Sequence, residues 1–242
     1  MIKLAISGCQ GRMGQRILDL ALKEKNFQIS CLLENKNRPE VKDTFLGFPV
    51  YFEPTALKGS DVLVEFTTPE ATLEHLKACQ KFGVKMVIGT TGLNPTQIAQ
   101  IKKAATKIPI IFSSNMSVGV NIVFGLIRRA AQVTGKNYDM YLTETHHVHK
   151  KDAPSGTAKT MAEIAELAAK AKVHDIASIR EGEVIGDHTI TFDSSVDKIS
   201  IHHHAKTRDI FAQGALVAAK FLAKLNSKKK GLFNMQDVLG LS

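Results

Sequence analysis

The sequence of 242 residues lacks long hydrophobic runs and has few cysteines, and both features exclude classes of protein. No stretch of 18 or more apolar residues occurs, so a membrane-spanning helix is not expected. Cys9, Cys31 and Cys79 form an odd set without a C-x-x-C pair, which argues against a disulfide framework and a thiolate metal site. The segment after Met1 is strand-like and lacks the features of a signal peptide. We therefore expect a cytoplasmic protein with reduced cysteines and no membrane partner.

The charge is positive but lacks the pattern of a nucleic-acid-binding protein. The formal net charge is +9, yet the basic residues are scattered and their one compact run is 228–230. No basic stripe interleaved with aromatic residues occurs, so we expect no nucleic-acid partner. A positive balance suits an enzyme whose cofactor and substrate are both anionic, because it steers anions toward the protein.

The first half of the chain alternates short β-branched runs with segments of helical period. This alternation predicts an α/β fold, with parallel strands joined by right-handed helical crossovers. Strands are expected at 2–7, 27–34, 61–66, 85–88 and 108–112, and helices at 11–23, 70–82 and 95–107. Segment 35–59 has little periodicity, and 48–52 alone in it is strand-like, so an abbreviated or irregular crossover is expected there.

The rhythm changes after Asn115 and predicts an α+β segment. Helices are expected at 118–133 and 155–171, and strands at 138–145, 186–192 and 198–205. A helical period returns at 215–225, and the apolar tail 231–241 is expected to dock against the body of the protein.

A glycine-rich turn follows the first strand and opens the first helix. Gly8, Gly11 and Gly14 form G-x-x-G-x-x-G, which permits a tight turn whose backbone amides hold a pyrophosphate at the helix N-terminus. A turn that serves packing alone is the alternative. Arg12 faces either a cofactor phosphate or the helix surface. The turn residues that we expect to contact the cofactor are Gly8, Cys9, Gln10, Gly11, Arg12 and Met13.

Glu34 ends the second strand, about 20 residues past the last glycine, where dinucleotide-binding folds carry an acidic residue. Its carboxylate would accept hydrogen bonds from the ribose hydroxyls and repel a 2′-phosphate. Together with Asn35, where an arginine would clamp a phosphate better, it favours NADH. Lys36 and Arg38 leave NADPH open as a second cofactor. A solvated carboxylate at the strand end is the alternative role of Glu34.

Two further loops follow strands at the carboxyl edge of the sheet, where open α/β sheets bind ligands. The segment 89–92 (GTTG) offers small residues that let a nicotinamide or ribose approach, and 113–116 (SSNM) offers an amide and hydroxyls that orient the carboxamide. Either loop alone would be an ordinary turn. The expected cofactor contacts are Gly89, Thr90, Thr91, Ser113, Ser114, Asn115 and Met116.

The segment 144–158 carries the clearest chemical signal. Three histidines and two lysines fall within positions 146–151, and Ser155 or Thr157 can cap a helix whose free amides face an anion. This pattern predicts a carboxylate pocket beside an acid/base group, and a histidine supplies a proton near neutrality. The histidines alternate badly for chelation and cysteine ligands are absent, so no metal is expected. In the tract 202–204 the middle residue, His203, could line the substrate cavity.

The string H-H-x-H-K-x-D-A-P-S-G-T-A at 146–158 resembles the signature of the dihydrodipicolinate reductases. The same family shows the likeness at 8–14 (GCQGRMG), 89–92 (GTTG) and 115–121 (NMSVGVN), and at the ending MQDVL, so the resemblance spans nearly the whole chain. The sequence departs from the family at Asn35, at Thr68, where a basic residue is frequent, and in a shortened region after the second strand. These departures leave the cofactor preference open.

The resemblance implies the NAD(P)H-dependent reduction of 4-hydroxy-tetrahydrodipicolinate to tetrahydrodipicolinate, with loss of water, in lysine and diaminopimelate biosynthesis. It implies a Rossmann-like dinucleotide-binding domain (1–116 and 209–242) and an α+β substrate-binding domain (117–208) whose sheet builds a homotetramer. The roles carried over to this sequence are proton donor and acceptor for His146, second donor and substrate contact for Lys150, and binding of the substrate carboxylates for His147, Ser155, Gly156 and Thr157.

Two rival functions share part of this pattern. Another two-domain nicotinamide oxidoreductase, such as an amino-acid or sugar dehydrogenase, would share the glycine turn without requiring the string at 150–157. A dinucleotide-sensing regulator would lack a clustered acid/base set. Neither rival explains the histidine and lysine loop.

Overall fold

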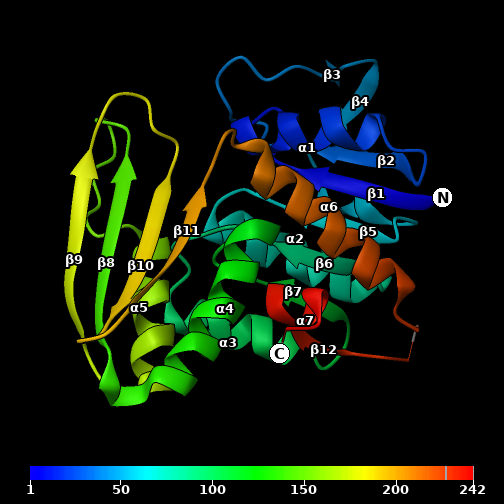
Figure 1. Cartoon of the computed structure of the whole chain (residues 1–242). Coiled ribbons are helices and arrows are strands. Elements are labelled where there is room, and N and C mark those ends of the chain that lie inside the picture. Colours follow the sequence, from blue (N-terminus) through cyan, green and yellow to red (C-terminus); the bar gives the residue numbers. More distant parts are fainter. Residues whose placement is uncertain (227, 242) are drawn as a thin grey trace. The chain divides into compact units, whose positions relative to one another are not determined.

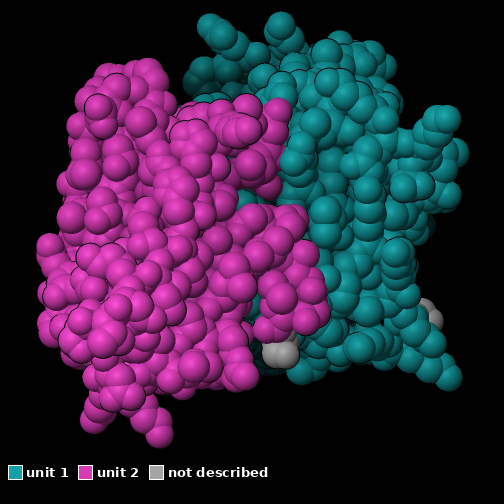
Figure 2. Space-filling view, viewed as in Figure 1, with its two compact units in different colours: residues 1–117, 211–238 teal, residues 118–210, 239–242 magenta. Residues whose placement is uncertain are grey.

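The computed structural model describes residues 1–226 and 228–241, and Figure 1 shows the course of the chain. The chain divides into two compact units, which Figure 2 colours separately. Unit 1 comprises Met1–Ser117 and Phe211–Val238, and unit 2 comprises Val118–Ile210 with the residues from Leu239 onward. Each unit has its own sheet and its own apolar core.

Unit 1 is built on an eight-stranded sheet. Its strands are β1 (Ile2–Ser7), β2 (Phe27–Leu33), β3 (Thr44–Phe45), β4 (Phe48–Tyr51), β5 (Val62–Glu65), β6 (Lys85–Ile88), β7 (Pro109–Phe112) and β12 (Gly231–Phe233). Their spatial order is β12-β7-β6-β5-β1-β2-β4-β3, and all pairs are parallel except β3 with β4. The chain builds outward from β1 first through β2 and then through β5, so the order reverses between β1 and β5. Open α/β sheets bind ligands at the carboxyl end of such a reversal.

Helices cover this sheet, which explains why its central strands read as continuous apolar runs: every residue of β5 is buried. The helices of unit 1 and its borders are α1 (Arg12–Leu22), η1 (Pro54–Leu57), α2 (Pro69–Phe82), α3 (Pro95–Ala104), α6 (Asp209–Lys224) and α7 (Met235–Leu239). Local sequence sets their ends. Thr68 caps α2 and Gly83 ends it in the left-handed conformation at φ 72°, while Asn94 and Gln97 form a capping box at the start of α3.

Unit 2 packs two helices against one face of a mixed sheet. Its elements are α4 (Val118–Thr134), η2 (Gly135–Asn137), β8 (Asp139–His146), α5 (Gly156–Ala169), β9 (Val173–Arg180), β10 (Asp187–Asp193) and β11 (Lys198–His204). The strand order is β11-β10-β8-β9, with β8 and β9 parallel and the other pairs antiparallel. Met140 and Leu142 of β8 point into the core with Ile190 and Phe192 of β10, while the intervening residues of β8 lie on the open face.

The α/β class and most of the elements expected from the sequence are confirmed. The crossover after β2 is irregular, as expected: it contains no α-helix and holds β4 and the short η1. β9 was missed, because its sequence VHDIASIR mixes polar and apolar residues without strict alternation. α6 begins at Asp209 and not at Ala215. Over the described residues, no helix is both long and apolar enough to cross a membrane.

Gly214 provides a stability test of the packing of α6. A Cβ atom at this position would lie 1.7 Å from the carbonyl oxygen of Met116, a backbone atom that cannot rotate away. Helix propensity alone favours alanine by about 1 kcal/mol, but overpacking of this kind costs about 1–3 kcal/mol. We therefore expect Gly214→Ala to lower the midpoint of urea unfolding. The exposed neighbour Gln213 is the matched control, since Gln213→Ala should change stability by less than about 0.5 kcal/mol. Equal midpoints for the two variants would contradict the packing argument.

Candidate functional site

The backbone geometry of the turn after β1 requires glycine at two of its positions. Gly8 has a φ of +69°, and a Cβ atom there would lie 2.6 Å from the carbonyl oxygen of Phe66. A Cβ on Gly14 would lie 2.0 Å from the Gly8 carbonyl oxygen, and the Gly11 amide donates to that same oxygen at 2.8 Å. Gly11 is the N-cap of α1 and has no side chain to cap it, so the first amides of the helix stay available to an anion.

Glu34 holds this turn from the end of β2. Its carboxylate accepts hydrogen bonds from the amides of Gln10 and Asn35, both at 2.9 Å, and its side chain is 5% exposed. It is therefore not a solvated strand-end carboxylate. Arg38 lies beside it, with NH1 3.8 Å from Glu34 Oε2 and NH2 donating to the Gln10 carbonyl oxygen at 3.0 Å. Glu34, Asn35, Lys36 and Arg38 line one side of a cavity of about 400 Å³.

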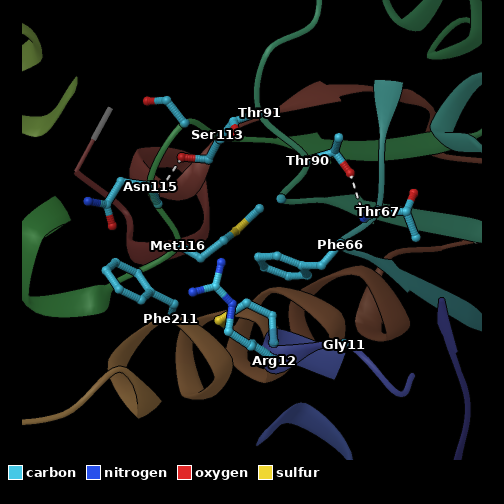
Figure 3. A pocket seen from close by; sticks show the side chains of 13 residues that line it. Gly11, Arg12, Phe66, Thr67, Thr90, Thr91, Ser113, Asn115, Met116 and Phe211 are labelled. Atoms are coloured by element: carbon cyan, nitrogen blue, oxygen red, sulfur yellow. Dashed lines mark hydrogen bonds between the residues drawn. The ribbon is translucent and has the colours of Figure 1, made fainter. Parts of the chain in front are cut away.

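A second cavity, of about 440 Å³, gathers most of the remaining predicted cofactor residues (Figure 3). Figure 3 shows the Arg12 side chain pointing into this cavity between the rings of Phe66 and Phe211, so Arg12 does not lie along the outer helix surface. The predicted residues that line the cavity are Gly11, Arg12, Met13, Gly89, Thr90, Thr91, Ser113, Ser114, Asn115 and Met116.

Two other predicted residues of the turn point elsewhere. The Cys9 side chain is fully buried, and burial raises the pKa of its thiol to about 12. The Gln10 side chain forms two hydrogen bonds with the backbone of Lys42, at 2.7 and 3.1 Å, and so ties the turn to the following loop. Both residues can meet a ligand through their backbone alone.

Packing explains why the loop after β6 begins with a glycine. A Cβ on Gly89 would lie 2.2 Å from the ring of Phe66, so the ring occupies the space that a side chain would need. The Thr90 hydroxyl accepts from the Thr67 amide at 3.1 Å and is 2.9 Å from the Thr72 hydroxyl. Nothing in the sequence pattern of Phe211 or His75, which also line the two cavities, singled them out.

In unit 2, strand register assembles a buried cluster around His146. His146 ends β8 and is paired in register with Arg180 of β9, while Glu144, two residues earlier on the same face, is paired with His188 of β10. His146 Nδ1 and Glu144 Oε2 are hydrogen-bonded, and Arg180 NH2 lies 3.0 Å from Glu144 Oε1. The rings of His146 and His188 meet edge to face, with centroids 5.0 Å apart. Glu144, Arg180 and His188 were not expected as site residues. Arg180 and His188 reach the cluster only through strand register, which carries no local sequence signal. The alternation of β8, by contrast, could have placed Glu144 on the same face as His146.

The environment sets the protonation of these groups. Burial would raise the pKa of Glu144, but its hydrogen bonds with Arg180 and His146 bring it below its ordinary value. Burial lowers the pKa of His146; Glu144 opposes this shift, while the positive charges of Lys150 and Arg180 add to it. Burial also lowers the pKa of His188, to about 4, so this ring is neutral at neutral pH. The result is a buried histidine whose Nδ1 is fixed by a carboxylate, leaving Nε2 for other partners.

Three of the predicted substrate residues form the start of α5. The Ser155 hydroxyl caps the helix by accepting from the Ala158 amide at 3.2 Å, and it lies 3.2 Å from His188 Nε2. Gly156 and Thr157 form the first turn of α5, whose amides face outward from the N-terminus. Lys150 Nζ lies 2.9 Å from Asp152 Oδ1.

The other histidines near the site lie in the loop after β8 and on β11. His147 Nδ1 is buried and has no hydrogen-bond partner among the described residues, whereas His149 is exposed. His203 is paired in register with His188, and therefore lies on the cluster side of the sheet. His202 and His204 both contact Asp187, at 3.3 and 2.9 Å.

The cluster also satisfies a geometric criterion for a metal site. One potential ligand atom from each of Glu144, His146 and His188 lies within 4.8 Å of the others. Both oxygens of Glu144 are already engaged, however: Oε2 by His146, and Oε1 by Arg180 and by the Ser155 amide at 3.3 Å. A cation would displace these donors and lie close to the Arg180 charge, so the arrangement suits proton transfer better than metal binding.

Comparison with known proteins identifies the family of this chain. The family model described as "Dihydrodipicolinate reductase, N-terminus" matches residues 2–116, and "Dihydrodipicolinate reductase, C-terminus" matches residues 119–239. A 4-hydroxy-tetrahydrodipicolinate reductase of Polynucleobacter necessarius is 40% identical and one of Nitrosospira multiformis 39% identical, with 99% of this chain and at least 98% of each relative covered.

Among solved structures, a dipicolinate-bound dihydrodipicolinate reductase from Paenisporosarcina sp. TG-14 superposes with a TM-score of 0.82. Its sequence identity is 24%, and 98% of each chain is covered, so it shares the fold. The resemblance drawn from the motifs is confirmed, and the chain belongs to the dihydrodipicolinate reductase family.

Proposed function

We propose that this chain reduces 4-hydroxy-tetrahydrodipicolinate to tetrahydrodipicolinate with a nicotinamide dinucleotide, with loss of water, and that His146 is its proton donor. Membership of the family supports the reaction class. The observation that carries the assignment of residues is the buried Glu144–His146 pair beside the N-terminus of α5. A buried acid/base group next to oriented amides fits a small dianion that must gain a proton.

Unit 1 is the proposed dinucleotide-binding domain, and its residues fit such a ligand. The uncapped amides at the start of α1 would hold the pyrophosphate, and Glu34 would accept hydrogen bonds from the ribose hydroxyls through its remaining lone pairs. Thr91, Ser113 and Asn115 would surround the nicotinamide ribose and carboxamide. A bound reduced nicotinamide would supply the hydride.

Unit 2 is the proposed substrate-binding domain. Hydride addition to a ring conjugated to an imine leaves negative charge, which His146 neutralises by donating a proton from Nε2 while Glu144 keeps Nδ1 occupied. Lys150 is the second donor. The substrate carboxylates bind the amides at Gly156 and Thr157 and the ring of His147.

NADH is the proposed preferred cofactor, with NADPH as the second. Glu34 faces the expected ribose position, and Asn35 supplies no charge for a 2′-phosphate. Arg38 and Lys36 line the same cavity and give a 2′-phosphate a positive partner.

Assembly and location are also proposed. The face of the unit 2 sheet away from α4 and α5 exposes Tyr141 and Ile179, each more than 40% accessible, and this face supports a homotetramer built through the sheet. The cytoplasm is the proposed location, since it maintains both reduced dinucleotides and free thiols such as those of this chain.

A direct assay tests the reaction. Oxidation of NADH and NADPH is followed at the nicotinamide absorbance, with substrate generated from pyruvate and aspartate semialdehyde by the preceding synthase. We expect turnover by the wild type and a loss of about 10²- to 10⁴-fold in kcat for His146→Gln, with NADH affinity unchanged. The exposed His174, which pairs with Asp139, is the control: His174→Gln should keep full kcat. Absence of turnover with both cofactors removes the proposed reaction.

The pH dependence should reveal the environment of His146. The pKa of His146 is lowered from its ordinary value of 6.5 in the free protein. A general acid must carry its proton, so kcat/KM should fall as pH rises through this lowered pKa. A bound dianion adds negative charge beside the ring and raises its pKa. We expect the corresponding limb of kcat to lie at higher pH than that of kcat/KM, in steady-state profiles at constant ionic strength. Coincident limbs, or limbs retained by His146→Gln, would assign the proton donor to another group.

Cofactor preference is tested at Glu34 and Arg38. Glu34→Gln keeps an acceptor for the Gln10 amide but loses the charge, and a lost charged hydrogen bond is worth about 1.5–3 kcal/mol, so NADH affinity should fall about tenfold or more. NADPH should be affected less, whereas Arg38→Met should weaken NADPH more than NADH. Fluorescence titration gives both dissociation constants, and Glu53→Gln, at an exposed position, is the control. An equal loss of affinity for both cofactors in Glu34→Gln would show that Glu34 does not bind the ribose hydroxyls.

A further inference from the structure

Arg180 connects parts of the histidine site that belong to different elements. It ends β9, its side chain is 19% exposed, and its register partner on β8 is His146. The guanidinium donates to Glu144 Oε1 (3.0 Å) and to the carbonyl oxygens of Ile179 (2.7 Å), Asp152 (2.5 Å) and Lys150 (3.3 Å).

Three of these acceptors matter for the site. One belongs to Glu144, the carboxylate that fixes His146 Nδ1. The other two are backbone carbonyls of the loop that carries Lys150, whose ammonium group is itself paired with Asp152 at 2.9 Å. One planar guanidinium thus holds the loop and the acid pair together. A lysine, with a single point charge on a flexible stem, cannot reproduce these planar guanidinium hydrogen bonds.

We propose that Arg180 is a positioning residue for the reduction, which holds the segment 150–152 against the Glu144–His146 pair so that both proton donors keep one geometry. The inference rests on the proposed function, because it concerns how the two donors of that reaction are arranged. Arg180 itself need not touch the substrate.

The charge of Arg180 gives the proposal a second, independent readout. The titratable and charged groups that face His146 are Glu144 on β8, Arg180 on β9, His188 on β10 with His203 behind it on β11, and Lys150 in the loop. Burial has the largest effect on the pKa of His146 and lowers it. Glu144 raises this pKa, and Arg180 is one of the two cations that lower it further. Loss of Arg180 therefore raises the pKa of His146, whereas loss of the Glu144 charge lowers it further.

Two substitutions separate the effect of the guanidinium hydrogen bonds from the effect of the positive charge. Arg180→Lys keeps the charge and loses the planar set of donors, and Arg180→Ala loses both. Arg129, an exposed arginine on α4, provides the matched control Arg129→Ala. Displacement of catalytic groups by about 1 Å lowers rates by about 100-fold, so we expect losses of that order in kcat for both Arg180 variants and none for the control. The pH limb should stay at the wild-type position in Arg180→Lys and move to higher pH in Arg180→Ala.

Chemical rescue distinguishes positioning from a general loss of structure. Because the Arg180 side chain is partly exposed, guanidinium chloride at concentrations far below those that unfold the protein should enter the vacated space in Arg180→Ala. It should raise kcat several-fold there and leave Arg129→Ala unchanged. Two results overturn the proposal: wild-type kcat in Arg180→Ala, or a loss of kcat without rescue and without a moved pH limb.

Two measurements that need no turnover keep this test separate from that of the proposed function. Titration of the histidine ring signals by NMR, with His146 assigned through His146→Gln among the nine histidines, should show a higher His146 pKa in Arg180→Ala and a lower one in Glu144→Gln. Hydrogen exchange should accelerate at 147–155 in Arg180→Ala, and not in α4. If the wild type has no activity but these changes occur, the proposed reaction fails and the positioning role stands. An unchanged His146 pKa together with unchanged exchange overturns the positioning role.

Discussion

A carboxylate that is buried must be surrounded by donors, and this constraint shapes both functional regions of the chain. Glu144 is completely buried on β8 and is satisfied by His146, Arg180 and the Ser155 amide. These donors come from a strand end, a neighbouring strand and a helix start, so satisfying one charge fixes three elements relative to one another. These donors hold the three elements together because an unpaired charge on Glu144 would be strongly unfavourable.

Glu34 plays the corresponding part in unit 1. Its carboxylate accepts the amides of Gln10 and Asn35, and so ties the glycine turn to the end of β2. Because Glu34 holds the turn through the Gln10 amide, and no side chain caps α1, the amides at the start of α1 are left available to a ligand. In both units a buried acid organises the backbone around a place where a negative ligand would bind, and in both an arginine, Arg38 or Arg180, lies next to that acid.

The sequence predicted those features whose signal is local. The glycine turn, the loops after β6 and β7, and the cap at Ser155 could be predicted because each is a short motif with its own backbone requirement. The contact between Glu144 and Arg180 could not be predicted, because the two residues are 36 positions apart and meet through the pairing of β8 with β9. β9 itself lacks the alternation that marks a half-buried strand, so neither its position nor its register was available to sequence reasoning.

The balance of charge around His146 suggests how proton uptake is matched to substrate. Before a ligand binds, burial and the cations Lys150 and Arg180 lower the pKa of the ring, and Glu144 offsets this effect in part. A dianion seated at the start of α5 would neutralise those cations and so favour the protonated ring. In the proposed reaction the acid is therefore charged when the substrate is present, and the same two carboxylates that bring the substrate to the site also raise the proton affinity of the group that must act on it.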